Sequence, residues 1–309
     1  MDVHSQYDNA VAEAADSETT GDLGIGDKGD APEKEESWLS FAFFLLKLIL
    51  AVLIFRSLLF SPFSIPSESM QPRLWNGDYL LASKWSYGFS NYSLPFNAPL
   101  IPGRIFADQP DRGDVVIFKH PIDKKDYIKR AIGLPGDTIE VVGGQVMLNG
   151  ELIPREPIVD FVQPVDELML ARQSENKDLG FAAASPCGKP KFEEISDAGV
   201  RQCRYPRYRE TLPSGVSYNV LDFGPDEFLD DFDRITVGEG DLFVMGDNRD
   251  NSLDSRAVAS PDAGVGIVSQ DLLVGEATII MWSTDGGAVW YKPWTWFSST
   301  RWGRIGDTL

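Results

Sequence analysis

The chain has 309 residues and a formal net charge of −19, with 28 basic and 47 acidic side chains. This acidity excludes a nucleic-acid partner, because binding to a phosphate backbone depends on clustered Lys and Arg. The sequence contains two histidines and two cysteines, so a zinc site built on histidine is not expected.

The first 36 residues form an acidic tail, rich in Asp, Glu, Gly, Ser and Ala and almost free of bulky apolar side chains. A segment of this composition cannot bury enough apolar surface to offset its ordering entropy. We therefore expect residues 1–36 to be disordered. The negative charge also argues against the basic n-region of a cleaved signal peptide.

An apolar run of 23 residues follows, from Trp38 to Phe60. As a helix it would be roughly 34 Å long, enough to cross the hydrocarbon core of a bilayer. Lys47 and Arg56 interrupt it on opposite helix faces, and each would cost ~2.5–3.5 kcal/mol at mid-bilayer unless it snorkels to the interface. We predict a single transmembrane anchor over residues 37–60, with a buried or interfacial helix as the alternative.

The chain after the anchor is predicted to be mainly β, because apolar and β-branched runs alternate with turn residues. Leu-Pro-Gly-Asp at 134–137 is typical of a type II turn, and Gly143-Gly144 and Asn149-Gly150 predict tight hairpin turns. No stretch shows sustained helical periodicity, and no Gly-rich phosphate loop supports nucleotide binding. The predicted strands lie within residues 78–88, 114–120, 126–133, 138–153, 241–247 and 275–282.

Residues 141–240 are less regular and more polar, and we interpret them as a lobe inserted into a core formed by 61–140 and 241–309. The lobe contains Cys187 and Cys203. If it lies outside the cytoplasm, a disulfide is expected, worth on the order of 3 kcal/mol in the chain-entropy model; two unrelated thiols are the alternative.

Aromatic residues are dense near the C-terminus, and we expect them to pack in the core or at sheet edges. The alternative is a belt at a membrane interface. The residues are Trp290, Tyr291, Trp294, Trp296, Phe297 and Trp302.

Two serines, Ser67 and Ser69, follow the anchor almost directly. Period-two strand geometry places Tyr127 and Lys129 on one face of a predicted strand. A lysine in an apolar interior loses solvation, its pKa falls from about 10.4, and the neutral amine can take a proton from a serine hydroxyl. A Ser-Lys pair is a known variant of the Ser-His arrangement. His120 is the alternative base, and a solvated lysine with serines in a turn is the non-catalytic alternative.

The sequence GDNRDNSLDSR at 246–256 is strongly polar and follows an apolar strand. A calcium loop of the EF-hand type is excluded, since there is no Gly at the sixth position and no Glu at the twelfth. A surface turn remains open. So does a polar network that positions a catalytic group, with Asp254 and Arg256 paired and a serine reaching the base.

Four motifs occur in the order found in bacterial type I signal (leader) peptidases, and together the chain resembles that family over residues 62–256. The resemblance implies a mainly antiparallel β catalytic core with a second β-rich lobe inserted after the lysine strand, behind a single N-terminal transmembrane helix. The motifs are IPSESM at 65–70 with Pro72 and Leu74, RGDVVIFKHP at 112–121, YIKRAIGLPGD at 127–137, and GDNRDNSLDSR at 246–256.

The resemblance also implies roles for individual residues. Ser69 would be the nucleophile and Lys129 the general base, and the Ser67 hydroxyl with the Ser69 N–H would form the oxyanion hole. Ser252 would hold the lysine amine in line, while Asp254 and Arg256 would brace its loop. No metal or cofactor is expected. The pockets for small substrate residues at −1 and −3 would be lined by Phe63, Ile65, Met70, Leu74, Tyr127 and Ile128.

Glu68 departs from the family pattern, because many members have glycine at this position. A carboxylate that pointed inward beside the nucleophile would raise the pKa of the lysine. We therefore expect Glu68 to point to solvent.

The implied function is that of a membrane-bound serine endopeptidase that removes N-terminal signal peptides from exported preproteins at small-x-small sites. Expected partners are signal peptides, the bilayer and the secretion translocon. The expected location is the bacterial inner membrane, single-pass, with a cytoplasmic N-terminus and the catalytic part on the outer side. Lys28 and Lys34 before the span, against Arg73 after it, favour this orientation weakly.

Two alternatives remain open. One is a peptidase specialised for a single pilin or conjugative-transfer precursor, with the same chemistry. The other is a non-catalytic membrane-tethered relative, in which loss of Ser69 or Lys129 would be expected although both are present.

Overall fold

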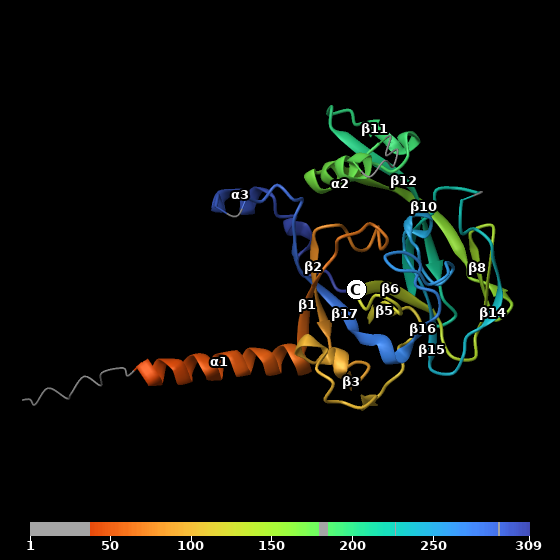
Figure 1. Cartoon of the computed structure of the whole chain (residues 1–309). Helices are drawn as coiled ribbons and strands as arrows, with labels where there is room; N and C mark the ends of the chain where they lie inside the picture. Colours follow the sequence, from red (N-terminus) through yellow and green to blue (C-terminus); the bar gives the residue numbers. More distant parts are fainter. Residues whose placement is uncertain (1–37, 179–184, 226, 290) are drawn as a thin grey trace, which may run out of the picture. The chain divides into compact units, whose positions relative to one another are not determined.

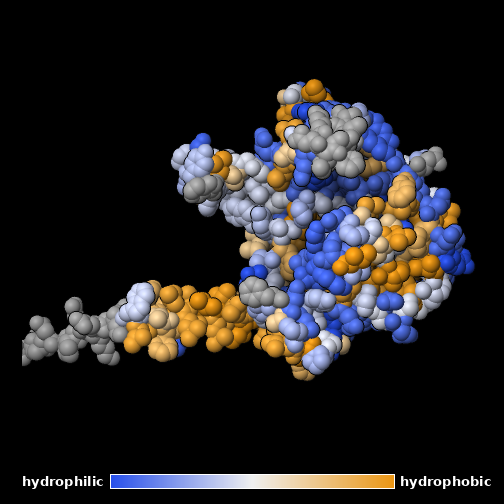
Figure 2. Space-filling model, in the orientation of Figure 1, coloured by the Kyte–Doolittle hydropathy of each residue, from blue (hydrophilic) through white to orange (hydrophobic). Residues whose placement is uncertain are grey.

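The computed structural model describes residues 38–178, 185–225, 227–289 and 291–309 (Figure 1). The acidic tail, predicted to be disordered, lies outside these ranges, as does Trp290. Helix α1 (Trp38–Leu58) reaches a mean hydropathy of 2.5 and is long and apolar enough to cross a membrane by length and composition. Its side chains present an almost continuous hydrophobic surface (Figure 2).

Helix α1 ends two residues before the apolar run does, because Phe60 begins a strand. Strand β1 (Phe60–Ser64) pairs antiparallel with β2 (Asp78–Ser83). Every pairing in this sheet is antiparallel, in the order β1-β2-β17-β5-β6-β15-β16. The remaining strands are β5 (Val115–Lys119), β6 (Asp126–Gly133), β15 (Asp241–Met245), β16 (Val268–Ser269) and β17 (Leu273–Ser283).

Strand β5 is almost entirely apolar because both of its faces are buried. Val115 and Ile117 belong to one buried cluster, and Val116 and Phe118 belong to another. Because alternate residues of a strand point to opposite faces, both faces of β5 are covered. The first cluster also contains Ile65, directly before the two serines.

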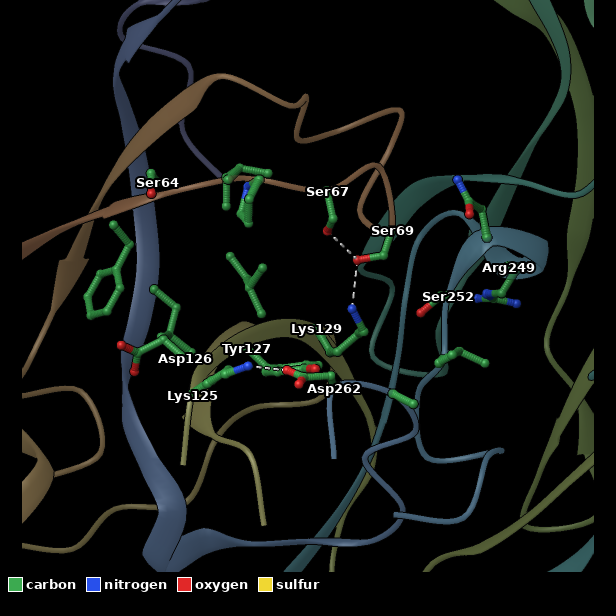
Figure 3. A pocket seen from close by; sticks show the side chains of 18 of the residues that line it. Ser64, Ser67, Ser69, Lys125, Asp126, Tyr127, Lys129, Arg249, Ser252 and Asp262 are labelled. Atoms are coloured by element: carbon green, nitrogen blue, oxygen red, sulfur yellow. Dashed lines mark hydrogen bonds and ion pairs between the residues drawn. The ribbon is translucent and has the colours of Figure 1, made fainter. Parts of the chain in front are cut away.

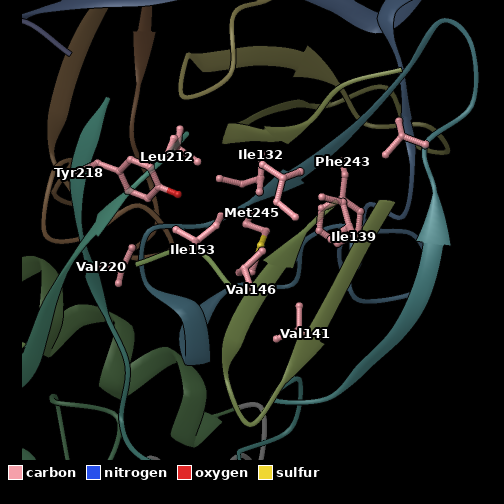
Figure 4. Packing of buried hydrophobic residues seen from close by; sticks show 12 residues of the cluster. Ile132, Ile139, Val141, Val146, Ile153, Leu212, Tyr218, Val220, Phe243 and Met245 are labelled. Atoms are coloured by element: carbon pink, nitrogen blue, oxygen red, sulfur yellow. The ribbon is translucent and has the colours of Figure 1, made fainter. Parts of the chain in front are cut away.

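The predicted hairpins at residues 138–153 are confirmed. Strands β7 (Thr138–Val142), β8 (Gln145–Leu148) and β9 (Glu151–Leu152) form a sheet with β14 (Phe232–Thr236) in the order β14-β7-β8-β9. Both residues of each turn have positive φ, 54° and 76° at Gly143-Gly144 and 56° and 84° at Asn149-Gly150, which a tight two-residue hairpin requires. Side chains from this sheet pack with residues from β6, β15 and the strand β13 (Ser217–Leu221) (Figure 4).

A further sheet is formed by β10 (Arg155–Pro164), β11 (Glu193–Ile195), β12 (Arg201–Thr211) and β13 (Ser217–Leu221). Cys187 and Cys203 are joined by a disulfide, with their Cα atoms 5.5 Å apart, in a buried cluster with aromatic side chains. The boundaries proposed between core and lobe stay a prediction, and residues 47–309 together form one compact unit.

Helix α2 (Glu167–Asp178) was not predicted. Its sequence, ELMLARQSENKD, is rich in good helix formers, but its apolar residues are clustered at 168–171 and do not recur at helical spacing. Met169 is nearly fully buried, whereas Leu170 is exposed. The high helix propensity of these residues was the only feature of the sequence that indicated this helix.

The C-terminal aromatic residues were expected in the core or at sheet edges. Core packing is wrong for those that are described, which are exposed, although Trp302 packs edge-on against Trp282 of β17. Trp294 and Phe297, on helix α3 (Pro293–Ser298), are 70% and 69% exposed. Phe297 stacks on Trp302, so these rings contact one another at the surface. The short elements of the described chain are β3 (Phe89–Ser90), β4 (Arg104–Ile105), η1 (Asn91–Ser93), η2 (Pro95–Asn97), η3 (Pro190–Phe192), η4 (Arg249–Asn251), η5 (Gln270–Leu272) and η6 (Trp302–Arg304).

Candidate active site

A pocket of about 520 Å³ lies between the segment that follows β1, strand β6 and the polar loop at 246–256 (Figure 3). Apolar side chains form much of its wall, and Ser67, Ser69 and Lys129 open into it. Lys129 is 60 residues from Ser69 in sequence, and β6, which pairs with β5 inside the sheet, carries it to the two serines.

Ser69 and Lys129 are in direct contact. The Nζ atom of Lys129 lies 2.7 Å from Ser69 Oγ, and Ser67 Oγ lies 3.3 Å from the same oxygen. Lys129 is only 4% exposed. Burial lowers the pKa of Lys129 from 10.5 to about 8, although the charges of Asp254 and Asp247 act in the opposite direction. A neutral amine beside a serine hydroxyl can accept the proton of that hydroxyl.

The backbone around Ser69 is held by Asn248, from the polar loop. The Asn248 N–H donates to the Ser69 carbonyl at 3.0 Å, and its side-chain Nδ2 donates to the Glu68 carbonyl at 3.1 Å. Asn248 was not among the predicted site residues. Its position in the polar motif was the only signal, since an asparagine in a turn is unremarkable by itself.

Gly246 allows the loop to approach the serine segment this closely. A Cβ atom at this position would lie 2.5 Å from the Ser69 carbonyl oxygen and would also overlap Ser252. Any other residue would push the loop away from Ser69, so a glycine is required by the close backbone approach.

Asp254 and Arg256 form a buried ion pair at 2.8 Å, and Asp254 also accepts the Gly246 N–H at 2.9 Å. Burial would raise the pKa of Asp254, yet the Arg256 charge and these hydrogen bonds hold it below its usual value. Arg256 Nη2 donates to the Arg249 carbonyl at 2.6 Å. The loop is therefore a polar network, and within the described ranges no group of three or more His, Cys, Asp or Glu is placed to hold a metal ion.

Two further buried ion pairs fasten the loop to neighbouring strands, and neither was predicted. Arg130 makes a bidentate contact with Asp247, at 2.7 and 2.6 Å, next to Lys129 on β6. Arg249 makes a bidentate contact with Glu210 on β12, with one of its bonds at 2.6 Å. Arg249 and Glu210 are 2% and 1% exposed, so this pair is sealed from solvent.

Ser252 lies in the pocket wall and is buried. Its hydroxyl makes no hydrogen bond to any described residue, and the Lys129 amine donates to Ser69 Oγ instead. The supporting role of Ser252 therefore stays a prediction.

The predicted pocket wall is only partly assembled. Phe63, Ile65, Tyr127 and Ile128 line the pocket. Met70 and Leu74 are fully buried and are not among the side chains that line it, so their contribution to the substrate pockets stays a prediction. Both belong to the buried cluster that includes side chains of β2 and β5. Full burial there removes more of their apolar surface from water than a place at the pocket wall would, which stabilises the fold.

Several lining residues were missed because their segments carry no local signal for a pocket. Ile117 lies on β5, where both faces are apolar, and Leu253 lies within the polar motif. Phe228 and Leu229 come from the acidic stretch between β13 and β14, which is distant in sequence.

His120, the alternative base, does not reach the serines. The ring is fully buried, its Nε2 lies 3.1 Å from the Gly264 carbonyl, and its Nδ1 accepts backbone N–H groups of Ile122 and Asp123 at 3.3 Å. The ring packs 4.8 Å from that of Tyr127, so it supports the pocket wall from behind.

The expectation that Glu68 points to solvent is wrong. Glu68 is 7% exposed, and its Oε2 lies 2.8 Å from Arg172 on α2 and 3.2 Å from Nδ2 of Asn251. Burial raises the pKa of Glu68, against the opposing charge of Arg172. Because neighbouring side chains point in different directions, Glu68 faces helix α2 while Ser69 faces Lys129.

Removing the Arg172 charge is expected to destabilise the protein. In Arg172→Ala the Glu68 carboxylate stays buried without a cation, and we expect the free energy of unfolding to fall by about 1–3 kcal/mol near neutral pH. The loss should shrink at acidic pH, because protonation of Glu68 removes the unpaired charge. Denaturant titrations at both pH values measure this.

The double variant Glu68→Gln/Arg172→Ala is the matched control, since it lacks the carboxylate. It should be more stable than Arg172→Ala alone near neutral pH. An Arg172→Ala variant with the same deficit at acidic and neutral pH would contradict the ion pair.

Comparison with known proteins yields matches over most of the chain. The family described as "Signal peptidase, peptidase S26" matches residues 38–282. The chain is 34% identical over 259 residues to "Signal peptidase I" of Rickettsia conorii, covering 81% of this chain and 80% of that protein. It is 32% identical over 291 residues to "Signal peptidase I" of Rickettsia felis, covering 88% and 91%. A crystal structure of a signal peptidase I from Enterococcus faecalis is 24% identical and covers 55% of this chain and 98% of that chain, with a TM-score of 0.27, too low to support a conclusion.

Proposed function

The chain belongs to the signal peptidase family, peptidase S26, and we propose that it is a membrane-anchored serine endopeptidase that removes N-terminal signal peptides from exported preproteins. The observation that carries the proposal is the 2.7 Å contact between Lys129 Nζ and Ser69 Oγ in a largely apolar pocket. A buried amine with a lowered pKa is suited to activate a serine.

In the proposed mechanism neutral Lys129 takes the proton of Ser69, and Ser69 Oγ attacks the carbonyl carbon of the substrate residue at −1. The C–N bond then breaks, the lysine ammonium protonates the leaving amine, and the regenerated amine activates the water that hydrolyses the acyl-enzyme. The Ser67 hydroxyl and the Ser69 N–H stabilise the oxyanion. Removing one such donor typically costs about 10²–10³ in kcat.

We attribute the proposed preference for small residues at −1 and −3 to the pocket walls. Phe63, Ile65, Tyr127 and Ile128 contribute bulky side chains around a shallow space. We expect these bulky walls to restrict the side chains that the pocket accepts at −1 and −3. The substrate would lie extended alongside a strand of the sheet.

The anchor places the enzyme beside its substrates. Helix α1 would confine the peptidase and a membrane-inserted signal peptide to one plane, which raises their effective concentration. We propose a cytoplasmic N-terminus and a catalytic part on the outer face, near the translocon. The catalytic core would comprise 61–140 and 241–309, and the inserted lobe 141–240.

A panel of precursors tests this function. The full-length protein in detergent is incubated with unrelated precursors whose signal peptides share only small residues at −1 and −3, and the new N-termini are sequenced. We expect cleavage after the −1 residue in each, and none when Phe replaces the residue at −1 or −3. Cleavage of a single pilin-like precursor alone would favour the specialised alternative, and no cleavage of any would contradict the proposal.

The pH dependence of cleavage is expected to follow Lys129. Only the neutral amine can accept the Ser69 proton, so activity should rise with pH up to about 8 and then level off. Measuring kcat/KM for one precursor between about pH 6 and 10 tests this. A profile that is flat across that range would be incompatible with a lysine base, and His120→Ala should leave the profile in place.

A further inference from the structure

A second pocket, of about 650 Å³, lies at the C-terminal end of α1. Leu53, Arg56 and Ser57 of the helix line it, together with residues from β1, from the turn after β2 and from η1. It shares Phe63, Ser64, Pro66 and Asp126 with the pocket that contains Ser69, so the two pockets have a common wall.

Lys84 is a buried lysine that forms no direct ion pair in this second pocket. The residue is 3% exposed, and its Nζ makes one long hydrogen bond, 3.4 Å to the Tyr92 carbonyl, and lies 5.6 Å from the Phe63 ring centroid. Among the described residues it forms no ion pair. A buried ammonium is costly unless an anion accompanies it. Asp126 lines the same pocket and its charge acts on Lys84, but its carboxylate pairs directly with Lys119, which leaves the Lys84 amine without an anion in contact.

The other charges that line the pocket are also mainly positive. Arg56 is exposed and makes no ion pair with any described residue, and Lys119 pairs with Asp126 at 2.8 Å. Three cations therefore line the pocket with one carboxylate, in a chain whose overall charge is strongly negative. This local excess of positive charge favours a ligand with a net negative charge.

The pocket lies at the C-terminal end of the one described helix that is long and apolar enough to cross a membrane. Arg56 belongs to the last turn of α1, and the other described side chains of that helix are mostly apolar and exposed. Trp85, next to Lys84 in sequence, is 47% exposed, and its ring packs 4.8 Å from that of Phe60. Tryptophan, lysine and arginine are enriched at membrane interfaces, where basic pockets bind lipid headgroups.

We propose that this pocket binds the phosphate of an anionic phospholipid, with Lys84 and Arg56 contacting phosphate oxygens and the acyl chains lying along the apolar side chains of α1. A zwitterionic headgroup would bring its own ammonium among the cations and would bind less well. The inference concerns lipid binding, so it does not depend on the proposed peptidase activity. Through the shared wall, a bound lipid would also brace the substrate pocket.

Thermal unfolding of the full-length protein in detergent tests the site. Short-chain phosphatidylglycerol, short-chain phosphatidylcholine and inorganic phosphate are titrated separately. We expect phosphatidylglycerol to raise the Tm of the wild type in a saturable manner, because a ligand that binds only the folded state stabilises it. Phosphatidylcholine and inorganic phosphate should give little shift at the same concentrations.

Lys84→Met keeps the length of the side chain and removes the charge. Without lipid it should have a Tm at or above that of the wild type, since no unpaired ammonium is buried. Its affinity for phosphatidylglycerol should fall by roughly tenfold or more, as should that of Arg56→Gln. Lys191→Gln, an exposed lysine in the lobe, is the control and should respond as the wild type does.

Equal shifts with phosphatidylglycerol and phosphatidylcholine in the wild type would overturn the proposal. An undiminished response of Lys84→Met to phosphatidylglycerol would do the same. A saturable effect of inorganic phosphate at the same concentrations would show a site for free phosphate and rule out the lipid as the specific ligand.

Discussion

Ser69→Ala and Lys129→Ala are each expected to lower kcat for precursor cleavage by roughly 10⁴-fold or more, while the protein stays folded. The two groups act as a unit across a 2.7 Å contact, so the double variant should be little worse than either single variant. Cleavage of a model precursor in membrane fractions, followed over time, measures the rates. Ser214→Ala, at an exposed serine of the lobe, is the matched control and should cleave normally.

Stability measurements separate loss of chemistry from loss of fold. Burial lowers the pKa of Lys129 in the folded state, so between about pH 8 and 10.5 the unfolded chain binds more protons than the folded one. This contribution makes the wild type more stable as the pH rises through that window, and Lys129→Met should lack it. Full activity in Lys129→Ala would disprove the assignment of the base.

Glu210→Leu is expected to lower the free energy of unfolding by about 3–5 kcal/mol, because it leaves the Arg249 guanidinium buried and unpaired. The pair is almost inaccessible to water, and Glu210 also accepts a hydrogen bond from Tyr218 Oη at 3.1 Å. Since Arg249 belongs to the loop that holds Ser69, precursor cleavage should fall as well. Chemical denaturation reports the stability, and precursor cleavage reports the activity.

Two control variants show whether burial is the cause. Glu210→Leu/Arg249→Met removes both charges and should recover much of the lost stability, since apolar replacements of a buried pair are often tolerated. Glu140→Leu breaks an exposed pair with Arg234 and should cost less than about 1 kcal/mol. Equal losses in Glu140→Leu and Glu210→Leu would contradict the burial argument.

The elements that were predicted correctly have local causes. The tight turns at Gly143-Gly144 and Asn149-Gly150 follow from residues that tolerate positive φ. The strand at 115–119 follows from an apolar run with β-branched residues. Helix α2 was missed because propensity alone is a weak signal when apolar residues do not recur at helical spacing.

Pocket composition could be predicted less well than the elements. Ser69 and Lys129 were identified because both lie in motifs that occur in the same order as in the resembling family. Phe63 lies just before the first of these motifs, and Tyr127 begins the motif that contains Lys129. Phe228 and Leu229 reach the pocket only through the path of the chain between β13 and β14.

The sequence by itself determined the apolar helix, most strands, the turns and the pair of residues proposed for catalysis, because periodicity, turn chemistry and motif order are properties of neighbouring residues. Only the tertiary structure decided which single charged side chains are buried and which partners they have. Glu68 is buried against Arg172 rather than exposed, and Lys84 is buried without a direct ion pair. The cost of burying a charge depends on which distant residues surround it, and that environment exists only in the folded chain.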